Sequence, residues 1–337
     1  MKKILFFTCE PGGAEVLIPV IQEMNEDNAF EVIVLSYGLA MDRFNKRNIL
    51  FETINPIQKD DFSIFLTYQP DYIITSATSL PQKDMSEKFI WHNAKQSDIP
   101  TMAFLDQWQN YDIRFSGTSS NEYMLYQPDY INCINDIGKQ EMIELGFDSN
   151  KLLELGQPYL SQLKNTVLVD KEKIFEQLNL DKDKETVLFV SEAIYENYGN
   201  ARGYTQYKTL EYLLDNKEFI NNKQIIIKLH PKDDITKFDK YKDIILIQNE
   251  YTSYEMISVS DFIMGMTSIM LIEAYILEKK VLSIQLNSMK DLLLLSKYSF
   301  IDKITSIDKK IKEKNFTNKG NFLYTFDYEK LKGYIIK

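Results

Sequence analysis

Residues 224–231 read Gln-Ile-Ile-Ile-Lys-Leu-His-Pro, and residues 261–268 read Asp-Phe-Ile-Met-Gly-Met-Thr-Ser. Each stretch is an apolar run of strand length that stops abruptly in residues able to contact a ligand. A third short apolar run, residues 280–285, follows an apolar helical segment. Strands separated by helices at this spacing predict a parallel sheet, and open sheets of this kind bind ligands outside the carboxyl ends of their strands. We therefore expect both strand ends and a new helix N-terminus to lie at one edge of one sheet.

The edge formed by these strand ends suits a nucleotide phosphate. A helix N-terminus offers free backbone N–H groups and a partial positive charge, and the hydroxyls of Thr267 and Ser268 can add hydrogen bonds. Pro231 restricts His230 to an extended backbone, its imidazole would stabilise charge on a leaving phosphate, and Lys228 lies on the same strand face. Ser and Thr are also common as ordinary helix caps, and a lone histidine is often structural. Their combination on one predicted edge favours a phosphate site.

A carboxylate follows the two hydroxyls on the same predicted helix. Glu273 comes five residues after Ser268, roughly 7–8 Å farther along the helix at about 1.5 Å per residue. This separation would let the helix end bind phosphate while Glu273 binds the ribose hydroxyls. The alternative is a carboxylate at the edge of the core that faces water.

Length and composition limit the possible folds and partners. A chain of 337 residues exceeds the usual size of one core, so two domains are expected. The net charge of −10 disfavours a nucleic-acid partner and attachment to anionic lipid. Cys9 and Cys133 lie in apolar runs and are expected to be buried thiols, not a disulfide. No signal peptide and no apolar run of about 20 residues is recognisable, so a cytoplasmic protein is expected.

Strands and helices alternate along both halves of the chain, which predicts two Rossmann-like α/β domains. Gly156-Gln157-Pro158 follows the last predicted strand of the first half, and a charged cluster at residues 181–184 precedes the first strand of the second half. We therefore expect an acceptor-side domain over residues 1–160 and a nucleotide-binding domain over residues 161–337.

Two segments of the first half are candidates for binding the acceptor or the transferred group. Residues 8–15 form a predicted loop in which Gly12 and Gly13 permit close approach while Glu10 would repel phosphate, although a plain tight turn also fits this sequence. Residues 105–111 combine amide, carboxylate and aromatic side chains, a mixture that suits sugar binding but also an ordinary polar loop. The candidates are Asp106, Trp108, Asn110 and Arg114, with Glu192 at the matching strand end of the second domain.

Patterns of metal ligands and of serine nucleophiles are missing. The sequence has no His-x-x-x-His, no Cys-x-x-Cys and no Gly-x-Ser-x-Gly, and its one Asp-x-Asp, Asp181-Lys182-Asp183, belongs to the charged cluster between the two halves and not to a strand end. No metal site and no cofactor is therefore expected.

The ordered set of motifs resembles the GT-B glycosyltransferase superfamily: a glycine-rich first loop, Gly-Gln-Pro at the junction, His-Pro after a strand, and a hydroxyl pair followed by Glu-Ala. His230-Pro231 and Thr267-Ser268 are similar to elements of bacterial sialyltransferases, capsule-polysaccharide transferases and teichoic-acid glycerophosphotransferases. In those families the equivalent residues contact nucleotide phosphates. Residues 105–115 also resemble an L-D-x-W-x-N-Y-x-x-R-F element of the superfamily. The resemblance implies two Rossmann-like domains that face each other across a cleft.

The resemblance further implies a glycosyltransferase of polysaccharide biosynthesis. It would move a sugar, without a metal, from a UDP-, CMP- or CDP-linked donor to a glycan or lipid-linked acceptor, and a homodimer fits this class. His230, Thr267 and Ser268 would neutralise the leaving phosphate. Asp106 or Glu10 would deprotonate the acceptor hydroxyl.

Two alternatives stay open. Nucleotide-sugar 2-epimerases share the fold and the spacing from Ser268 to Glu273, but this chain has Ser76-Ala77-Thr78 where they have an aspartate and Ser191-Glu192-Ala193 where they have His-Arg-Arg-Glu-Asn. A non-catalytic nucleotide-sugar-binding protein with a GT-B shell is the second alternative. The donor base, the transferred group and the acceptor do not follow from the sequence.

Overall fold

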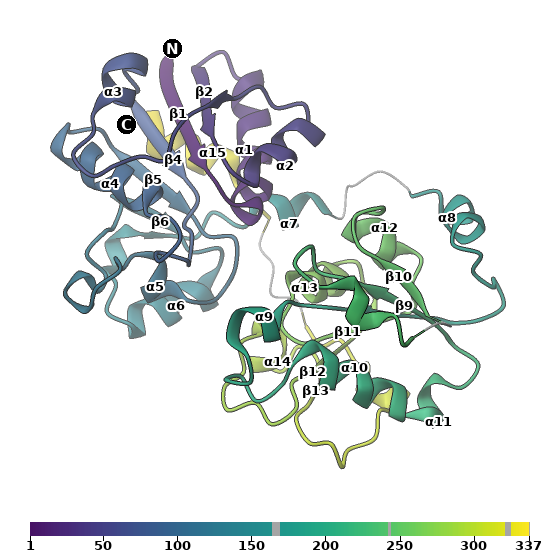
Figure 1. The fold of residues 1–337 in the computed structure, drawn as a ribbon. Helices are drawn as coiled ribbons and strands as arrows, with labels where there is room; N and C mark the ends of the chain where they lie inside the picture. The colour runs from purple at the N-terminus through teal and green to yellow at the C-terminus, as the bar shows by residue number, and fades with distance from the viewer. Residues whose placement is uncertain (164–168, 242–243, 321–324, 337) are drawn as a thin grey trace. The chain divides into compact units, whose positions relative to one another are not determined.

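The computed structural model describes residues 1–163, 169–241, 244–320 and 325–336 (Figure 1). The chain divides into two compact units, one formed by Met1–Gln162 and Phe322–Lys337 and the other by Leu163–Asn321. Each unit contains one parallel β-sheet whose strands alternate with helices. The prediction of two Rossmann-like α/β domains is therefore confirmed.

The first unit is built on a seven-stranded sheet with the order β3-β2-β1-β4-β5-β6-β7. Its central strand β1 is apolar and buried from Ile4 onward, because helices and neighbouring strands cover it on all sides. Cys9 and Cys133 are buried free thiols, as predicted. The strands are β1 (Lys2–Thr8), β2 (Phe30–Ser36), β3 (Glu52–Thr53), β4 (Tyr72–Thr75), β5 (Thr101–Phe104), β6 (Tyr130–Asn132) and β7 (Leu152–Leu153), and the helices are α1 (Pro11–Glu26), α2 (Ala40–Lys46), α3 (Ser63–Tyr68), α4 (Ser86–Gln96), α5 (Tyr111–Arg114), α6 (Asp136–Glu144), α7 (Pro158–Leu163) and α15 (Tyr328–Ile336).

The second unit is built on a six-stranded sheet with the order β10-β9-β8-β11-β12-β13. The two stretches with which the sequence analysis opened form β9 and β11, and both pair in parallel with β8. The strands are β8 (Thr186–Val190), β9 (Gln224–Lys228), β10 (Ile245–Ile247), β11 (Phe262–Gly265), β12 (Lys280–Ile284) and β13 (Lys303–Ile304), and the helices are α8 (Lys171–Gln177), α9 (Ile194–Tyr198), α10 (Gln206–Asp215), α11 (Lys217–Ile220), α12 (Ser253–Ser258), α13 (Ile269–Ile276) and α14 (Leu294–Lys297).

Both sheets reverse their strand order at the first strand of the unit. The change of direction lies between β1 and β4 in the first unit and between β8 and β11 in the second. At such a point the loops after the two strands lead to opposite faces of the sheet and leave a crevice in which ligands bind. Most of the predicted site residues follow these strands or the strands beside them.

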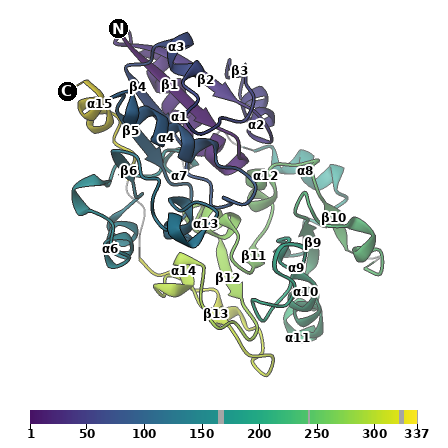
Figure 2. The same ribbon diagram turned by 60° about the vertical axis from the view of Figure 1, so that its left-hand side comes forward.

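The C-terminal helix α15 returns to the first unit. Leu331 and Ile335 are buried in the core of that unit, and the Lys332 ammonium pairs with the Asp27 carboxylate at 2.5 Å. Figures 1 and 2 show this yellow helix among the purple and blue elements of the first unit. The predicted second domain, which extended to the C-terminus, is therefore too long, because the apolar face of α15 is buried on the first sheet.

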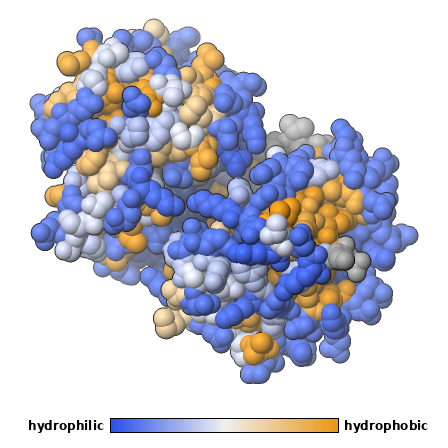
Figure 3. Space-filling view, in the orientation of Figure 1, coloured by the Kyte–Doolittle hydropathy of each residue, from blue (hydrophilic) through white to orange (hydrophobic). Residues whose placement is uncertain are grey.

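Hydrophilic residues cover most of the face shown in Figure 3, and apolar residues form separate patches there. Among the described residues, no helix has the length and the apolarity that a membrane crossing requires.

Candidate functional site

In the second unit, predicted site residues lie at the carboxyl ends of neighbouring strands. Glu192 follows β8, His230 follows β9 and Thr267 follows β11, around the point where the strand order reverses. Helix α13 begins directly after Ser268, whose hydroxyl caps the helix by accepting the N–H of Met270 at 3.2 Å. The edge that the sequence analysis described therefore exists, with a helix N-terminus at its centre.

The carboxylate of Glu192 is bound at the start of α13. Its Oε1 accepts the N–H of Thr267 at 2.5 Å and that of Met266 at 3.2 Å, and its Oε2 accepts the Thr267 hydroxyl at 2.7 Å. Burial raises the pKa of Glu192, whereas hydrogen bonds from Thr267 and the charge of Arg202 oppose this rise. The sequence predicts sugar or acceptor contacts for Glu192, but the structure places it on the donors that were predicted for phosphate.

Arg202 is a cation of this edge that the sequence analysis missed. It lies between α9 and α10, its guanidinium sits 3.9 Å from the ring centroid of Tyr198, and its charge acts on Glu192. The following Gly203 has a φ of +86°, and a Cβ there would lie 2.3 Å from a carbonyl oxygen of the β12–α14 loop. Only glycine fits this close approach, which fixes the loop that carries Arg202. The Arg202-Gly203 pair, just before a helical pattern in the sequence, was the available signal.

One of the two ring nitrogens of His230 makes a hydrogen bond within the described part of the chain. Its Nδ1 accepts the N–H of Lys232 at 3.0 Å, so the neutral ring carries its proton on Nε2, which has no hydrogen-bond partner in the part of the chain that the structure describes. Burial lowers the pKa of His230, with the charge of Asp233 opposing the change. The imidazole is therefore neutral near pH 7 and can donate one hydrogen bond.

Lys228 contacts the loop after β10, and Glu273 is buried within α13. The Lys228 ammonium donates to the carbonyl oxygens of Gln248 at 2.6 Å and Tyr251 at 2.8 Å, and so fastens the loop after β10. Glu273 is buried in α13, with 4% of its surface exposed. The structure thus groups Glu192, Thr267 and Ser268 at the start of α13 and gives Lys228 a structural role.

In the first unit, the two glycines pack against side chains from neighbouring strand ends. Helix α1 begins at Pro11, so Gly12 and Gly13 lie in its first turn and not in the predicted loop, because proline is compatible with that turn. A Cβ on Gly12 would lie 2.5 Å from Asp106 Oδ2, and a Cβ on Gly13 would lie 2.2 Å from Ser76 Oγ. Side chains of this unit therefore occupy the space beside Gly12 and Gly13 in which the acceptor or the transferred group was expected.

Arg114 ties Asp106 to the loop after β4. Its guanidinium lies 2.8 Å from Asp106 Oδ1, donates to the Ala77 carbonyl, and donates to the Gln109 carbonyl at 2.9 Å. Arg114 is buried, while the Asp106 side chain is 23% exposed. Glu10 is also partly exposed at the start of α1. Both carboxylates that were predicted as the base can therefore meet solvent at the carboxyl edge of this sheet.

Trp108 and Asn110 hold the loop after β5 in place. Trp108 is buried, and its Nε1 donates to the side-chain oxygen of Asn135 at 2.8 Å. The Tyr111 hydroxyl donates to Glu141 at 2.9 Å, and Asn110 turns the chain into α5 with a φ of +58°. Contrary to the prediction, Trp108 offers no face for stacking on a sugar, because burial of its large apolar surface in the core is more stable than exposure.

Two buried ionisable side chains that the sequence analysis missed lie beneath this edge. Glu87, on α4, accepts hydrogen bonds from the Ser76 hydroxyl and the Thr78 N–H, and burial raises its pKa to about 7. Lys88 donates to the Thr78 carbonyl at 3.1 Å, and burial lowers its pKa to about 8. Both side chains are fully buried and hold the loop after β4 from below.

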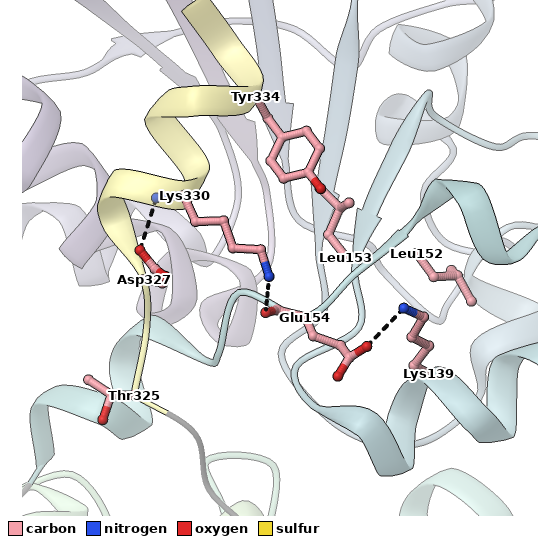
Figure 4. Close-up of a pocket in the computed structure, with 8 residues that line it drawn as sticks. All are labelled: Lys139, Leu152, Leu153, Glu154, Thr325, Asp327, Lys330 and Tyr334. Atoms are coloured by element: carbon pink, nitrogen blue, oxygen red, sulfur yellow. Dashed lines mark hydrogen bonds and ion pairs between the residues drawn. The ribbon is translucent and has the colours of Figure 1, made fainter.

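A pocket of about 320 Å³ lies elsewhere in the first unit, between the edge strand β7 and α15 (Figure 4). Lys139 and Glu154 form an ion pair of 2.8 Å within it. Its lining consists of Lys139, Leu152, Leu153, Glu154, Thr325, Asp327, Lys330 and Tyr334. None of these is a predicted site residue, so the candidate site is assigned to the strand ends.

Comparisons with known proteins add a family and a fold. Residues 87–288 match the family model described as CDP-Glycerol:Poly(glycerophosphate) glycerophosphotransferase. The UDP-GlcNAc 2-epimerase from Neisseria meningitidis bound to UDP-GlcNAc has a TM-score of 0.74 at 14% identity, with 100% of this chain and 99% of that chain covered. A glycosyltransferase from Rickettsia africae has a TM-score of 0.59 at 13% identity, with 99% of this chain and 88% of that chain covered.

Anabaena HepE in complex with UDP and glucose gives a TM-score of 0.60 at 13% identity, covering 94% of this chain and 88% of that chain. Curated protein sequences give no match. At such low identities the solved structures establish the fold alone. They confirm the predicted GT-B class of two Rossmann-like domains.

Proposed function

Because the chain belongs to the CDP-glycerol:poly(glycerophosphate) glycerophosphotransferase family, we propose that it transfers glycerol phosphate from a nucleotide-activated donor of the CDP-glycerol type to a hydroxyl of a cell-surface polymer. The observation that carries this proposal is the cluster of donors at the strand ends of the second unit. His230, Thr267 and Ser268 all fall within the matched residues 87–288. Helix N-termini with adjacent hydroxyls are common binding sites for phosphate.

The chemistry of such a donor explains what the second unit must do. The acceptor oxygen bonds to the phosphorus that carries glycerol, the bond from that phosphorus to the bridging oxygen breaks, and the bridging oxygen leaves with CMP. Negative charge therefore grows on the phosphate of CMP. The N–H groups at the start of α13, the hydroxyls of Thr267 and Ser268, and the Nε2–H of His230 would stabilise it.

The first unit would supply the base. The acceptor hydroxyl loses its proton as it attacks, and a carboxylate within hydrogen-bond reach can accept it. Asp106 is the better candidate because Arg114 fixes its orientation at 2.8 Å and leaves it partly exposed. Glu10 at the start of α1 is the second candidate.

Transfer of a sugar, which the resemblance implied, would use the same phosphate contacts. UDP-, CMP- or CDP-linked sugars are the corresponding donors. The 2-epimerase alternative is less well supported, since Ser191-Glu192-Ala193 replaces the basic motif of those enzymes and Glu192 contacts Thr267 in this structure. Measured turnover of CDP-glycerol against nucleotide sugars separates these reactions.

Calorimetric titration of CDP, CMP and UDP into wild-type protein and the His230→Ala variant tests the phosphate site. We expect the wild type to bind CDP and the variant to bind it about ten- to a hundredfold more weakly, the cost of one hydrogen bond to a charged group. His92→Ala is the matched control, since His92 is the other histidine of the chain and forms a hydrogen bond of 3.1 Å with Asp60 in the first unit. Unchanged CDP affinity in His230→Ala would contradict the assignment.

The reaction itself is tested by release of CMP from CDP-glycerol in the presence of a poly(glycerophosphate) acceptor. Release that depends on the acceptor supports the proposal. Turnover of a nucleotide sugar, but not of CDP-glycerol, would favour the glycosyltransferase. Tight nucleotide binding without turnover of any donor would favour the non-catalytic alternative.

A further inference from the structure

The strand-end site of the second unit is filled by an anion of the chain itself. The Glu192 carboxylate accepts the N–H of Met266, and both the N–H and the hydroxyl of Thr267, at 2.5–3.2 Å. These are the donors that the start of a helix offers to a phosphate oxygen. A donor phosphate and the carboxylate therefore compete for the same three groups.

Two further groups beside this carboxylate suit a phosphate. Arg202 contributes a positive charge that acts on both Glu192 and the Tyr204 hydroxyl. Tyr204 is 1% exposed, and its hydroxyl makes no hydrogen bond of normal geometry to a described residue. Burial raises the pKa of this hydroxyl to about 12, and the influence of Arg202, Glu192 and Thr267 on it shows that it faces the cluster. The site thus has a cation and an unused buried donor.

Glu192 reaches these donors through its side chain alone. Its side chain extends from the loop after β8 to the loop after β11 and is partly exposed, whereas Thr267 is buried. Rotation of the side chain toward water would free the N–H groups and leave both loops in position. Its desolvated environment already disfavours the charged form, which reduces the cost of that rotation.

We propose that Glu192 is a displaceable occupant of the donor-phosphate site, which holds the start of α13 in the empty protein and is replaced there by a phosphate of the donor. This inference rests on the proposed function, because it places the donor phosphate at this edge. It makes Glu192 a determinant of donor affinity and not a ligand of the sugar or acceptor. Arg202 would stay beside the bound anion before and after the exchange.

Glu192→Gln tests the exchange, since glutamine keeps the size and one acceptor oxygen but removes the charge. In calorimetric titrations at pH 7, the variant should bind CDP and, separately, inorganic pyrophosphate about tenfold more tightly than wild type, the order expected for a carboxylate at a helix N-terminus. Wild-type affinity should also approach that of the variant as the pH falls from 8 to 5, because protonation of Glu192 weakens its hold on the site. The other charged and polar groups of the site, which are Arg202, Tyr204, His230 and the ligand phosphates, are the same for wild type and variant. They therefore do not cause a difference between the two pH dependences.

Glu255→Gln is the matched control. Glu255 accepts the N–H and the hydroxyl of Thr252, both at 2.8 Å, at the start of α12, so this variant changes the same chemistry away from the site and should leave both affinities unchanged. If Glu192→Gln does not fold, Glu192→Asp, whose shorter side chain withdraws from the N–H groups, should show the gain in affinity.

Equal or weaker CDP binding by a folded Glu192 variant, with CDP bound by the wild type, would overturn the exchange and identify Glu192 as a fixed link between two loops. If wild type and all variants bind neither CDP, UDP nor pyrophosphate, the proposed function fails, and the exchange fails with it.

Discussion

Replacement of Glu87 by glutamine should remove a loss of stability that the first unit suffers as the pH rises. The carboxyl is fully buried, and burial raises its pKa from 4.5 to about 7. The folded state therefore binds more protons than the unfolded state between these values, so the free energy of unfolding falls as the pH rises from about 4.5 to about 7. At about 1.4 kcal/mol per pKa unit, the loss is about 3 kcal/mol once the carboxyl is ionised.

Glutamine keeps the size and one acceptor oxygen of Glu87 but does not titrate. Urea denaturation at pH 5, 6, 7 and 8 would measure the difference, followed by tryptophan fluorescence. Both tryptophans, Trp91 and Trp108, belong to the first unit and are buried, so their emission reports on that unit alone. The difference in free energy of unfolding, Glu87→Gln minus wild type, should increase by about 3 kcal/mol between pH 5 and pH 8.

One control variant and one shared group restrict the interpretation to Glu87. Glu31→Gln, at an exposed position that pairs with Lys3 at 3.8 Å, should follow the wild-type curve. Lys88 is present in both proteins, and its lowered pKa of about 8 adds stability only as the pH rises above that value. Parallel wild-type and Glu87→Gln curves from pH 5 to 8 would refute the reasoning, because they would mean that Glu87 keeps one charge state throughout.

Two further substitutions separate the roles of the units. Arg114→Lys keeps the charge but loses the planar contacts to Asp106, Ala77 and Gln109, so turnover of the donor should fall at least about tenfold while CDP affinity stays unchanged. Wild-type turnover would remove Asp106 from the mechanism. Leu331→Ala deletes a side chain with no exposed surface and should lower the free energy of unfolding of the first unit by about 2–5 kcal/mol. An unchanged fluorescence midpoint would contradict the packing of α15 on the first sheet.

The sheets could be predicted because their signal is local. Residues 225–227 and 262–264 are continuous apolar runs, as expected for strands of a parallel sheet, and a lysine and a glycine end the two runs. The start of α1 was misplaced because Gly12 and Gly13 favour a loop in isolation. Their place in a helix depends on Asp106 and Ser76, which are distant in sequence.

The errors made in predicting the site residues have one physical cause. Glu87 and Lys88 stand next to each other at a helix start and read as a solvated surface, yet both are fully buried because their partners come from the loop after β4. Trp108 shows the opposite error, since an aromatic residue among polar neighbours suggested a binding face but lies in the core. Depth of burial follows from tertiary packing, which composition and periodicity do not encode.

The two units make the same contact in positions that their topology makes equivalent. The glutamates that make this contact differ in exposure, and from this difference we infer which unit binds the donor phosphate. β4 and β11 both lie beside the first strand of their sheets, and a glutamate accepts a hydroxyl and an N–H from the loop after each. Glu87 is fully buried, so its departure would leave an ionisable group and two donors unpaired in the core.

Glu192 differs in the two respects that matter for exchange. It extends from the loop after another strand, β8, and it is partly exposed, so water can solvate the carboxylate when it turns away. An incoming phosphate then satisfies the vacated donors, with Arg202 beside it. The first unit has the same donors but no anion that can leave them, which is why we place the donor phosphate in the second unit and the acceptor with Asp106 in the first.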